Sequence, residues 1–452
     1  MNPLIFREYD IRGVEGKDLT QETVELLGKG IGTYYAQRGI RNITLARDCR
    51  LSSPPFHDAI LKGLLSCGME VTDLGVTPTP LLYFSIVHLK KEGGVMITGS
   101  HNPPEFNGFK VCVGKDAIYG EEIQRIRRII EGGKFATGEG VVTTYEIIRD
   151  YQGFLLNDIK LSKGLKVVID AGNGTAGVVA APVMRELGCE VTELYCEMDG
   201  HFPNHHPDPT VEAYMQDLIR TVKRLRADVG IGYDGDGDRI GVVDEKGEIV
   251  WGDRLMVIFA RSIIRERGGG TFIAEVKCSQ VLYDEIERLG GRAIMWRTGH
   301  SLIKDKMRKE GALLAGEMSG HMFFADRYFG YDDAIYASLR LLEIMSREGK
   351  RVSELLEGIP STYATPEIRV DCPDEVKFGL VERLKEEFRK EYEIIDVDGV
   401  RVKFPDGWGL VRASNTQPVL VLRFEALSPE RLKEIRGLIE GRVKELLEEI
   451  VR

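Results

Sequence analysis

Hydrophobic and polar positions along the chain repeat one pattern three times, in residues 42–71, 165–191 and 271–294. Each copy begins with a short apolar run typical of a buried strand, passes through a polar loop into a helical segment, and ends in a second apolar run. A glycine lies between each helical segment and the second strand, where it can take the left-handed conformation that ends a helix. Strand, helix and strand at this spacing predict a βαβ-type crossover in each copy.

The last part of the chain has a different pattern. A strand and a helix in residues 367–392 precede closely spaced apolar runs in residues 399–426, and a charged helix follows from Pro429. Strands at hairpin spacing flanked by helices predict a small antiparallel domain. We therefore expect an α/β fold of three similar, tandem, mixed-sheet α/β domains plus a smaller C-terminal α+β domain. The expected domains are residues 1–150, 151–252, 253–364 and 365–452.

Composition and charge narrow the function classes. The chain has 452 residues, 43% of them hydrophobic and 29% charged, which is ordinary for a globular protein. A net charge of −10 argues against nucleic acid or an acidic membrane as the main partner, while a phosphorylated small substrate stays possible. The seven cysteines are scattered with no CxxC pair, and no long apolar run or signal-peptide pattern occurs. These features predict a cytoplasmic protein with reduced thiols.

A serine lies on a tight loop at the end of a predicted strand. Residues 98–104 read TGSHNPP and follow the apolar run 94–97. The two prolines prevent an immediate helix, so Ser100 and His101 are held on a loop where α/β proteins often place their chemistry. Taken alone, the segment slightly favours an inert turn.

Three carboxylates lie within five residues in the sequence DGDGDR, residues 234–239. They repel one another unless a cation holds them, and the glycines between them allow the backbone to bring them together. Oxygen ligands in small number suit Mg²⁺. A calcium EF-hand is the alternative, but Arg239 stands where that loop requires glycine, and apolar strands flank the segment where helices would be needed.

Other polar loops carry groups suited to a sugar phosphate. Glu317 and Ser319 can bind vicinal hydroxyls, and the loop at residues 412–418 offers an arginine, hydroxyl groups and turn amides for a phosphate. A further polar loop lies at residues 298–301, and Lys110 follows Ser100 closely enough for the chain to fold back toward it.

Together, the loops at residues 100–103, 234–239, 316–321 and 412–418 closely resemble those of the α-D-phosphohexomutase superfamily. The resemblance covers the chain from Tyr9-Asp10-Ile11-Arg12-Gly13 to the last loop. The Glu-Met-Ser sequence at 317–319, with residues 298–301 and 107–110, is most similar to the phosphomannomutase/phosphoglucomutase branch. The phosphoglucosamine branch typically has Gln in place of Met318. Gln417 stands where many members have Glu.

The resemblance implies four domains around a central cleft. It also implies reversible phosphoryl transfer between the 1- and 6-positions of a hexose phosphate, mannose or glucose, through a phosphoserine at Ser100 and a hexose 1,6-bisphosphate. One Mg²⁺ per chain is expected on Ser100, Asp234, Asp236 and Asp238. Because a phosphoserine adds about −1.5 to −2 charges, it needs a divalent cation beside three aspartates.

The site residues that follow from the resemblance fall into two sets. Ser100 is the expected nucleophile, with His101 and Lys110 as alternative candidates for acid/base work. The expected substrate-binding residues are Arg239, His300, Glu317, Ser319, Arg412, Ser414, Asn415 and Thr416, with Arg12, Arg50, Lys277 and Arg297 as further cationic candidates.

Three other functions stay open at this point. One is a phosphoglucosamine mutase. Another is a Mg²⁺-dependent sugar-phosphate phosphatase that uses Asp234 as nucleophile and Asp236 as acid/base. The third is a sugar-phosphate-binding module without catalysis. In each case the partner is a small sugar phosphate, with neither nucleic acid nor membrane, and the chain is a monomer or a homo-oligomer.

Overall fold

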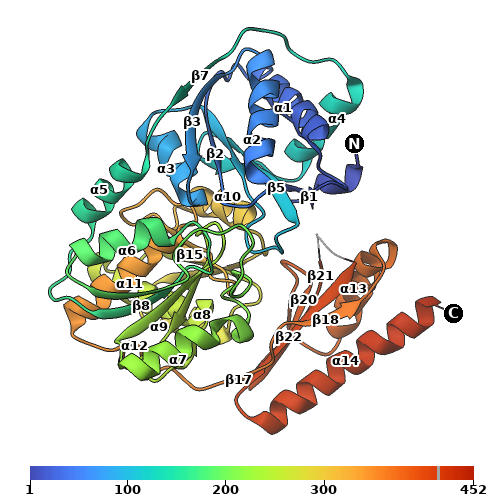
Figure 1. The fold of residues 1–452 in the computed structure, drawn as a ribbon. Coiled ribbons are helices and arrows are strands. Elements are labelled where there is room, and N and C mark those ends of the chain that lie inside the picture. Colours follow the sequence, from blue (N-terminus) through green and yellow to red (C-terminus); the bar gives the residue numbers. More distant parts are fainter. Residues whose placement is uncertain (415–417, 452) are drawn as a thin grey trace.

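The computed structural model describes residues 1–414 and 418–451, which form four β-sheets with helices packed on them (Figure 1). The N-terminal sheet has seven strands in the order β1-β5-β4-β2-β3-β7, with β6 paired to β5. Its strands are β1 (Ile11–Val14), β2 (Asn42–Arg47), β3 (Glu70–Val76), β4 (Gly93–Ile97), β5 (Phe106–Val113), β6 (Asp116–Ala117) and β7 (Val141–Thr144). The helices of this part are α1 (Gln21–Ala36), α2 (Ser53–Ser66), α3 (Thr79–His88), α4 (Glu121–Gly132) and the 3-10 turn η1 (Pro3–Ile5).

The second and third sheets are mixed. The second has the order β12-β11-β10-β8-β9 and the third the order β14-β13-β15-β16. Their strands are β8 (Lys166–Asp170), β9 (Glu190–Leu194), β10 (Val229–Tyr233), β11 (Ile240–Val243), β12 (Ile249–Val250), β13 (Thr271–Glu275), β14 (Arg292–Trp296), β15 (Leu314–Gly316) and β16 (Met322–Phe324). Their helices are α5 (Ile148–Asp158), α6 (Gly177–Glu186), η2 (Glu212–Met215), α7 (Gln216–Leu225), α8 (Gly252–Arg267), α9 (Gln280–Arg288), α10 (His300–Glu310), α11 (Ala334–Glu348) and α12 (Val352–Leu355).

The C-terminal sheet is antiparallel and has six strands, with both β17 and β18 paired to β22. Its elements are β17 (Tyr363–Ala364), β18 (Ile368–Asp371), α13 (Asp374–Phe388), β19 (Ile394–Ile395), β20 (Val400–Phe404), β21 (Gly407–Ala413), β22 (Val419–Ala426) and α14 (Pro429–Val451). The fourth sheet therefore begins at Tyr363, just before the boundary expected at residue 365, because Tyr363 and Ala364 pair with the end of β22.

The three repeats of the sequence pattern are confirmed as parallel crossovers. Strand β2 pairs in parallel with β3, β8 with β9, and β13 with β14. Each pair is joined by one helix, α2, α6 or α9. The α/β fold class with a smaller C-terminal domain is thus confirmed.

Close helix packing in the first domain depends on two glycines. A Cβ at Gly28 of α1 would lie 2.5 Å from the Ile60 carbonyl of α2, and one at Gly63 would lie 2.4 Å from the Glu25 carbonyl. The two helix backbones therefore approach each other closely because neither position carries a side chain. Thr20 begins α1 by accepting a hydrogen bond from the Thr23 amide at 3.3 Å.

The hydrophobic core is divided unequally among the domains. One continuous cluster runs through the second and third sheets and includes Phe84 of α3 and Tyr151 of α5, whose rings meet edge-on at 5.2 Å. The first and fourth domains have separate clusters of their own. The middle two domains therefore form one packed body, and the fourth domain docks on it as a separate unit, seen as the red arm in Figure 1.

Arg401 of β20 forms contacts that hold the fourth domain against the third. Its guanidinium stacks 3.7 Å from the centre of the Trp408 ring and donates to the carbonyl oxygens of Val276 (2.6 Å) and Cys278 (2.8 Å). The segment after β13 and the C-terminal sheet are held together by these contacts.

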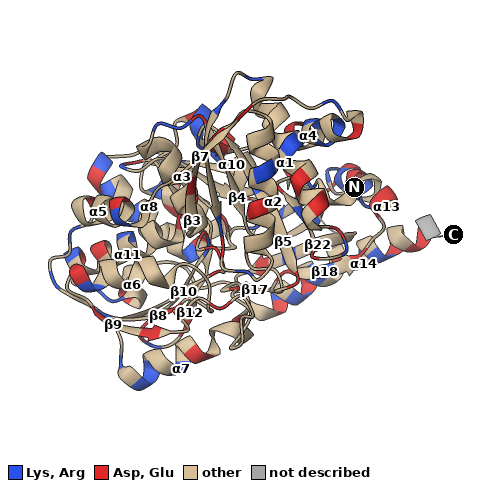
Figure 2. Ribbon diagram, turned by 45° about the horizontal axis from the view of Figure 1, so that its top comes forward, with Lys and Arg blue, Asp and Glu red and all other residues tan. Residues whose placement is uncertain are grey.

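The exterior carries both signs of charge. Figure 2 shows acidic and basic positions interspersed along α14 and over the outer helices. In the described part of the chain, no helix combines the length and the apolar character that crossing a bilayer requires.

Candidate active site

The Ser100 loop leaves β4 and meets the acidic turn of the second domain. Ser100 is buried, and its Oγ lies 3.0 Å from Oδ2 of Asp234 and 3.1 Å from Nδ1 of His101. Its backbone has a φ of 51°, a left-handed conformation that is unusual for a residue with a side chain. A Cβ at Gly235 would lie 2.6 Å from the Ser100 carbonyl, so the glycine lets the two loops touch.

The acidic residues lie on the hairpin that joins β10 to β11. Oδ1 of Asp234 accepts hydrogen bonds from the amides of Asp238 (3.0 Å) and Arg239 (3.1 Å), which closes the turn. The oxygens of Asp234, Asp236 and Asp238 lie within 4.8 Å of one another, and all three side chains are buried. The strands on both sides confirm that this turn is not an EF-hand.

The turn fits a small, hard cation. Within residues 1–414 and 418–451, Oδ1 of Asp236 and Oδ1 of Asp238 are buried without a hydrogen-bond partner. Buried carboxylate oxygens without a donor are costly, and a metal ion would satisfy them. Three oxygen ligands with room for further ones are typical of a Mg²⁺ site.

Lys110 of β5 contacts two of these carboxylates. Its Nζ donates to Oδ2 of Asp236 at 2.9 Å and also to Oδ2 of Asp238. Burial alone would lower the pKa of Lys110, but the charges of Asp236 and Asp238 outweigh it and raise that pKa. Lys110 therefore carries a positive charge next to the serine loop.

The pKa values of Asp234 and Asp236 are shifted in opposite directions. Burial, followed by the charges of Asp238 and Asp236, raises the pKa of Asp234 well above its usual value. Burial acts in the same direction on Asp236, but Lys110 and a hydrogen bond from Thr79 Oγ1 at 2.6 Å outweigh it and lower the pKa of Asp236.

The predicted sugar loop lies between β15 and β16. Ser319 Oγ donates to Oε2 of Glu317 at 3.1 Å, and the Gly299 amide donates to Oε1 of Glu317 at 2.7 Å. Glu275, at the end of β13, accepts from the Met318 amide at 2.9 Å and from Thr298 Oγ1 at 2.7 Å. Hydrogen bonds accepted by Glu275 and Glu317 thus join residues 298 and 299 to the loop that carries Glu317 and Ser319.

Asp332 organises the histidines of the third domain. Its Oδ1 accepts from Lys304 Nζ at 2.9 Å, and its Oδ2 lies 3.3 Å from Nδ1 of His321 and 3.8 Å from Nδ1 of His300. The two imidazole rings stack at 5.6 Å. His300, predicted as a substrate-binding residue, therefore lies beside His321 and near the buried Asp332 carboxylate.

Arg239 also contacts His321, one of these two histidines. Its Nε donates to Nε2 of His321 at 3.0 Å. Asp238, His321 and Asp332 also have atoms within 4.8 Å of one another. Because Nε2 accepts from Arg239, the ring proton of neutral His321 lies on Nδ1, and a protonated nitrogen cannot bind a metal. We therefore interpret this second group as an electrostatic cluster, in which Nδ1 of His321 lies 3.3 Å from Asp332 and 3.6 Å from Asp238.

The phosphate-binding candidates lie at the end of β21. Arg412 is buried, and its Nε donates to Oδ2 of Asp398 at 3.0 Å. Asp398 also accepts from the Thr298 amide at 3.0 Å, and Tyr9 Oη donates to the Thr298 carbonyl at 2.9 Å. Groups from the first, third and fourth domains meet here. Ser414 is buried at the strand end, and Asn415 and Thr416 lie outside the described residues.

The further cationic candidates lie in different surroundings. Arg12 donates to Oδ1 of Asn102 at 3.0 Å and contacts Asp10, beside the serine loop. Lys277 lies 3.1 Å from Glu367 of the fourth domain. Arg297 is exposed at the end of β14. Arg50 lies against the Ser100 loop and donates to backbone carbonyls there.

Sequence reasoning missed three residues of this region: Thr79, Asp332 and Asp398. Thr79 follows β3 in the polar sequence Thr77-Pro78-Thr79-Pro80, so its place at a strand end was a usable signal. Asp332 stands beside Asp333, and Asp398 follows Asp396 closely, so neither is distinguished in the sequence. Asp332 contacts Lys304 and His321 of its own domain, whereas Asp398 contacts Thr298 of another domain.

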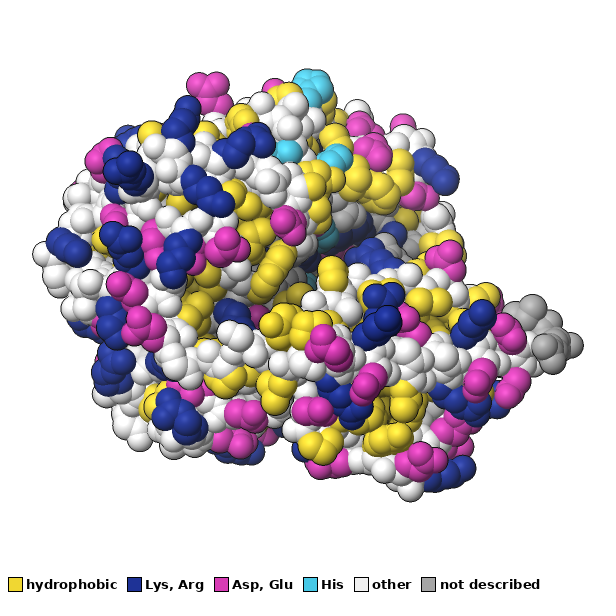
Figure 3. All heavy atoms as spheres, turned by 90° about the horizontal axis from the view of Figure 1, so that it is seen from below, with side chains coloured by type: hydrophobic (Ala, Val, Ile, Leu, Met, Phe, Trp, Pro, Cys, Tyr) yellow, Lys and Arg dark blue, Asp and Glu magenta, His cyan; other side chains and the backbone are white. Residues whose placement is uncertain are grey.

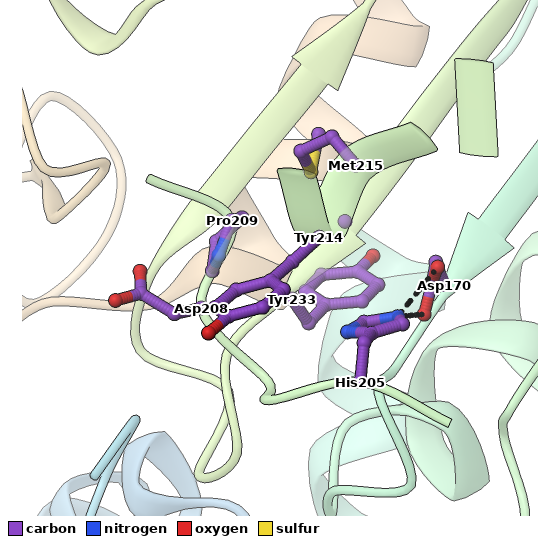
Figure 4. A pocket seen from close by; sticks show the side chains of 8 residues that line it. Asp170, His205, Asp208, Pro209, Tyr214, Met215 and Tyr233 are labelled. Carbon is purple, nitrogen blue, oxygen red and sulfur yellow. Dashed lines mark hydrogen bonds and ion pairs between the residues drawn. The ribbon is translucent and has the colours of Figure 1, made fainter. Parts of the chain in front are cut away.

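The molecule is hollowed next to these loops. Figure 3 shows an opening between the large body and the C-terminal arm, with Lys, Arg and His side chains visible inside it. A separate, much smaller cavity of about 10 Å³ lies behind the acidic turn, beside Asp170, His205 and Tyr214 (Figure 4). That volume holds about one water molecule, so it cannot accept a sugar phosphate.

Comparison with known proteins matches this arrangement over nearly the whole chain. Models of phosphoglucomutase/phosphomannomutase α/β/α domains I, II and III match residues 3–137, 149–247 and 251–363, and the C-terminal domain model matches residues 367–441. A phosphomannomutase/phosphoglucomutase of Pseudomonas aeruginosa is 47% identical over 97% of this chain and 95% of its own length.

Two further relatives agree. A phosphoglucomutase of Neisseria gonorrhoeae is 46% identical over 96% of this chain and 95% of its own. A solved phosphoglucomutase/phosphomannomutase family protein from Burkholderia thailandensis is 41% identical, with a TM-score of 0.94 over 99% of this chain and 98% of that one. Four matched domains and these full-length relatives show that the chain belongs to the phosphoglucomutase/phosphomannomutase family of the α-D-phosphohexomutase superfamily.

Proposed function

We propose that the protein reversibly converts the 1-phosphate of an aldohexose into its 6-phosphate, with glucose and mannose as the sugars. The observation that carries this proposal is the position of Ser100, whose Oγ lies 3.0 Å from Asp234 at the edge of the acidic turn. A phosphoryl group on Ser100 would lie against the carboxylates that fit a metal and beside the Lys110 ammonium.

Asp234, Asp236 and Asp238 would hold Mg²⁺, one per chain. When bound there, Mg²⁺ withdraws negative charge from the phosphoryl group that is transferred. The chain itself supplies the rest of the positive field through Lys110, which stays buried against Asp236 and Asp238.

In the first transfer, the bond between phosphorus and Ser100 Oγ breaks while an oxygen of the free sugar hydroxyl forms a new bond to phosphorus. The hydroxyl proton leaves, and Ser100 Oγ regains a proton. His101, whose Nδ1 lies 3.1 Å from Ser100 Oγ, and Lys110 are the two candidates for this proton traffic. The product is a hexose 1,6-bisphosphate.

In the second transfer, the bisphosphate turns end for end and its other phosphoryl group returns to Ser100. Arg412 and the loop that follows it hold the phosphate that is not reacting, in either orientation. Glu317 and Ser319 hold the 3- and 4-hydroxyl groups, which keep similar places in both orientations. Since none of these contacts depends on the 2-hydroxyl, both glucose and mannose phosphates fit.

The decisive experiment is Ser100→Ala, assayed with glucose 1-phosphate in the presence of Mg²⁺ and a trace of glucose 1,6-bisphosphate. We expect mutase activity to disappear while Mg²⁺ binding, measured by calorimetry, is retained. Substantial activity in this variant would falsify the role of Ser100.

Mapping the phosphorylated residue separates the mutase from a phosphatase. After incubation of the wild-type protein with glucose 1,6-bisphosphate, peptide mass spectrometry should find the phosphate on Ser100. Phosphate on Asp234 with release of inorganic phosphate would favour a phosphatase. Measuring kcat/KM for glucose, mannose and glucosamine 1-phosphates side by side then determines the sugar, and we expect similar values for glucose and mannose.

A further inference from the structure

Arg50 lies directly beneath the Ser100 loop and binds its backbone. Nη2 donates to the carbonyl oxygens of Ser100 (2.7 Å) and Asn102 (2.6 Å), and Nη1 donates to those of Pro103 (2.6 Å) and Phe106 (3.0 Å). Four of the five N–H donors of the guanidinium thus donate to four carbonyl oxygens of a single loop.

The fifth N–H donor of Arg50 is directed to Asp48. Arg50 Nε donates to Oδ2 of Asp48 at 3.1 Å, and the two side chains are 0% and 2% exposed. Asp48 in turn accepts from the Gly99 amide at 3.2 Å and from Ser53 Oγ at 2.5 Å. The ion pair is therefore buried with its hydrogen bonds satisfied, the condition under which a buried charge pair is tolerated.

The loop needs outside donors because of its sequence. Pro103 and Pro104 lack an N–H, so this stretch cannot form a regular hydrogen-bond ladder of its own. Ser100 has a φ of 51°, and the left-handed conformation costs a residue with a side chain about 1–2 kcal/mol. The Ser100 amide donates to Thr98 Oγ1 at 2.8 Å and its carbonyl accepts from Arg50, so both sides of the strained residue are fixed.

Two glycines leave the space that Arg50 occupies, because a side chain at either position would clash with it or with its backbone. A Cβ at Gly99 would lie 2.5 Å from the Arg50 guanidinium carbon. A Cβ at Gly200 would lie 2.5 Å from the Cys49 carbonyl and 2.9 Å from the Arg50 Cα, so the second domain packs directly on this segment. The ring of Phe202 lies 5.1 Å from the guanidinium. Arg50 thereby joins the serine loop to the domain that carries the acidic turn.

We propose that Arg50 is a positioning residue for phosphoryl transfer. It holds the backbone of Ser100 in the left-handed conformation that directs Oγ toward Asp234, and it does so without touching the substrate, since its five donors are already used. This inference rests on the proposed role of Ser100. On this proposal Arg50 supports the serine loop and is not one of the residues that bind the substrate.

The test compares Arg50→Met and Arg50→Lys with a control, Arg340→Met. Arg340 is equally buried and forms a two-bond ion pair with Asp326, at 2.9 and 2.8 Å, within the third domain. We expect Arg50→Met to lower kcat by about 100-fold, the cost of a reacting group displaced by about 1 Å, with KM for glucose 1-phosphate nearly unchanged. Arg50→Lys should fall between, because an ammonium has three donors for five sites. Arg340→Met should lower the melting temperature and leave kcat unchanged.

A second readout follows Ser100 itself. The rate at which glucose 1,6-bisphosphate phosphorylates Ser100, followed by intact-protein mass spectrometry, should fall in Arg50→Met by the same factor as kcat, while Mg²⁺ affinity stays at the wild-type value. A rise in KM with normal kcat, or a normal rate of Ser100 phosphorylation, would overturn the positioning role. If Arg50→Met does not fold, the same two outcomes are decided on Arg50→Lys. If the wild-type protein is not phosphorylated on Ser100, the proposed function fails instead.

Discussion

The Lys110 ammonium lies 2.9 Å from Oδ2 of Asp236 and also contacts Asp238, so one protein cation faces two of the three carboxylates of the acidic turn. The burial of all three groups strengthens this interaction, since charges interact more strongly away from water. Lys110 and a metal ion at the turn therefore repel each other while both are attracted to the same oxygens.

From this repulsion we predict that Lys110→Met binds Mg²⁺ about tenfold more tightly than the wild-type protein, although its mutase activity falls. Calorimetric titration of the dephosphorylated protein measures the affinity. Lys304→Met is the matched control, because Lys304 is also buried against a carboxylate, Asp332 at 2.9 Å, which is outside the turn. An affinity of Lys110→Met that equals or falls below that of the wild type would contradict this account.

Asp236→Asn removes one anionic oxygen from the turn and keeps the size of the side chain. We expect turnover to fall by at least about 100-fold, because less charge is available to hold the metal near Ser100.

Thr79→Val removes the 2.6 Å hydrogen bond that orients Asp236. Loss of such a supporting contact should weaken Mg²⁺ binding by about 10- to 100-fold. The Mg²⁺ dependence of the initial rate measures both effects, and an unchanged dependence in both variants would exclude this turn as the metal site.

His205 predicts a dependence of stability on pH that is separate from catalysis. Its Nε2 lies 3.1 Å from both carboxylate oxygens of Asp170, and its ring stacks on Tyr214 (Figure 4). Burial lowers the pKa of His205, but the hydrogen bond and charge of Asp170 outweigh it, so the net shift is upward. A raised pKa means that the folded protein binds the proton more tightly. The resulting stabilisation is complete below the unfolded pKa of about 6.5 and is lost as pH rises through the folded pKa.

His205→Gln should therefore lower the melting temperature more at pH 5.5 than at pH 9. The difference corresponds to up to about 2 kcal/mol, the contribution of a hydrogen bond to a charged group. His201→Gln is the control, since His201 is exposed and pairs with Asp199 at the surface. Equal losses for His205→Gln at both pH values would show that the pair contributes no proton-linked stability.

Local chemistry made much of this structure predictable from the sequence. The runs before Ser100 and Asp234 are continuously apolar, so they read as buried strands, and polar residues after such strands lie in loops. The three crossovers were predictable because a glycine ends each helix. The antiparallel fourth domain was predictable because its strands follow one another at hairpin spacing.

Contacts between domains were not predictable in this way. Asp398 and Thr298 lie 100 residues apart, in loops of different domains, yet the Thr298 amide donates to the Asp398 side chain. Thr79 and Asp236 are 157 residues apart. Arg50 illustrates a different gap. Its charge made it a further candidate for substrate binding, but charge alone does not reveal that the guanidinium donates to backbone carbonyls of the Ser100 loop.

Arg412 leads to the last prediction, which concerns the phosphate that does not react. Its Nε is fixed by Asp398 at 3.0 Å, which orients the guanidinium at the end of β21. Hydrogen bonds to charged groups contribute about 1.5–3 kcal/mol, so Arg412→Ala should raise KM for glucose 1-phosphate by about 10- to 100-fold. In the proposed mechanism the same contact retains the bisphosphate while it turns, so the variant should also need more added glucose 1,6-bisphosphate to sustain turnover. Arg389→Ala, which removes an exposed arginine of the same domain paired with Asp396, should change neither quantity. A KM of Arg412→Ala within twofold of wild type, with no added demand for bisphosphate, would move the phosphate site away from this strand end.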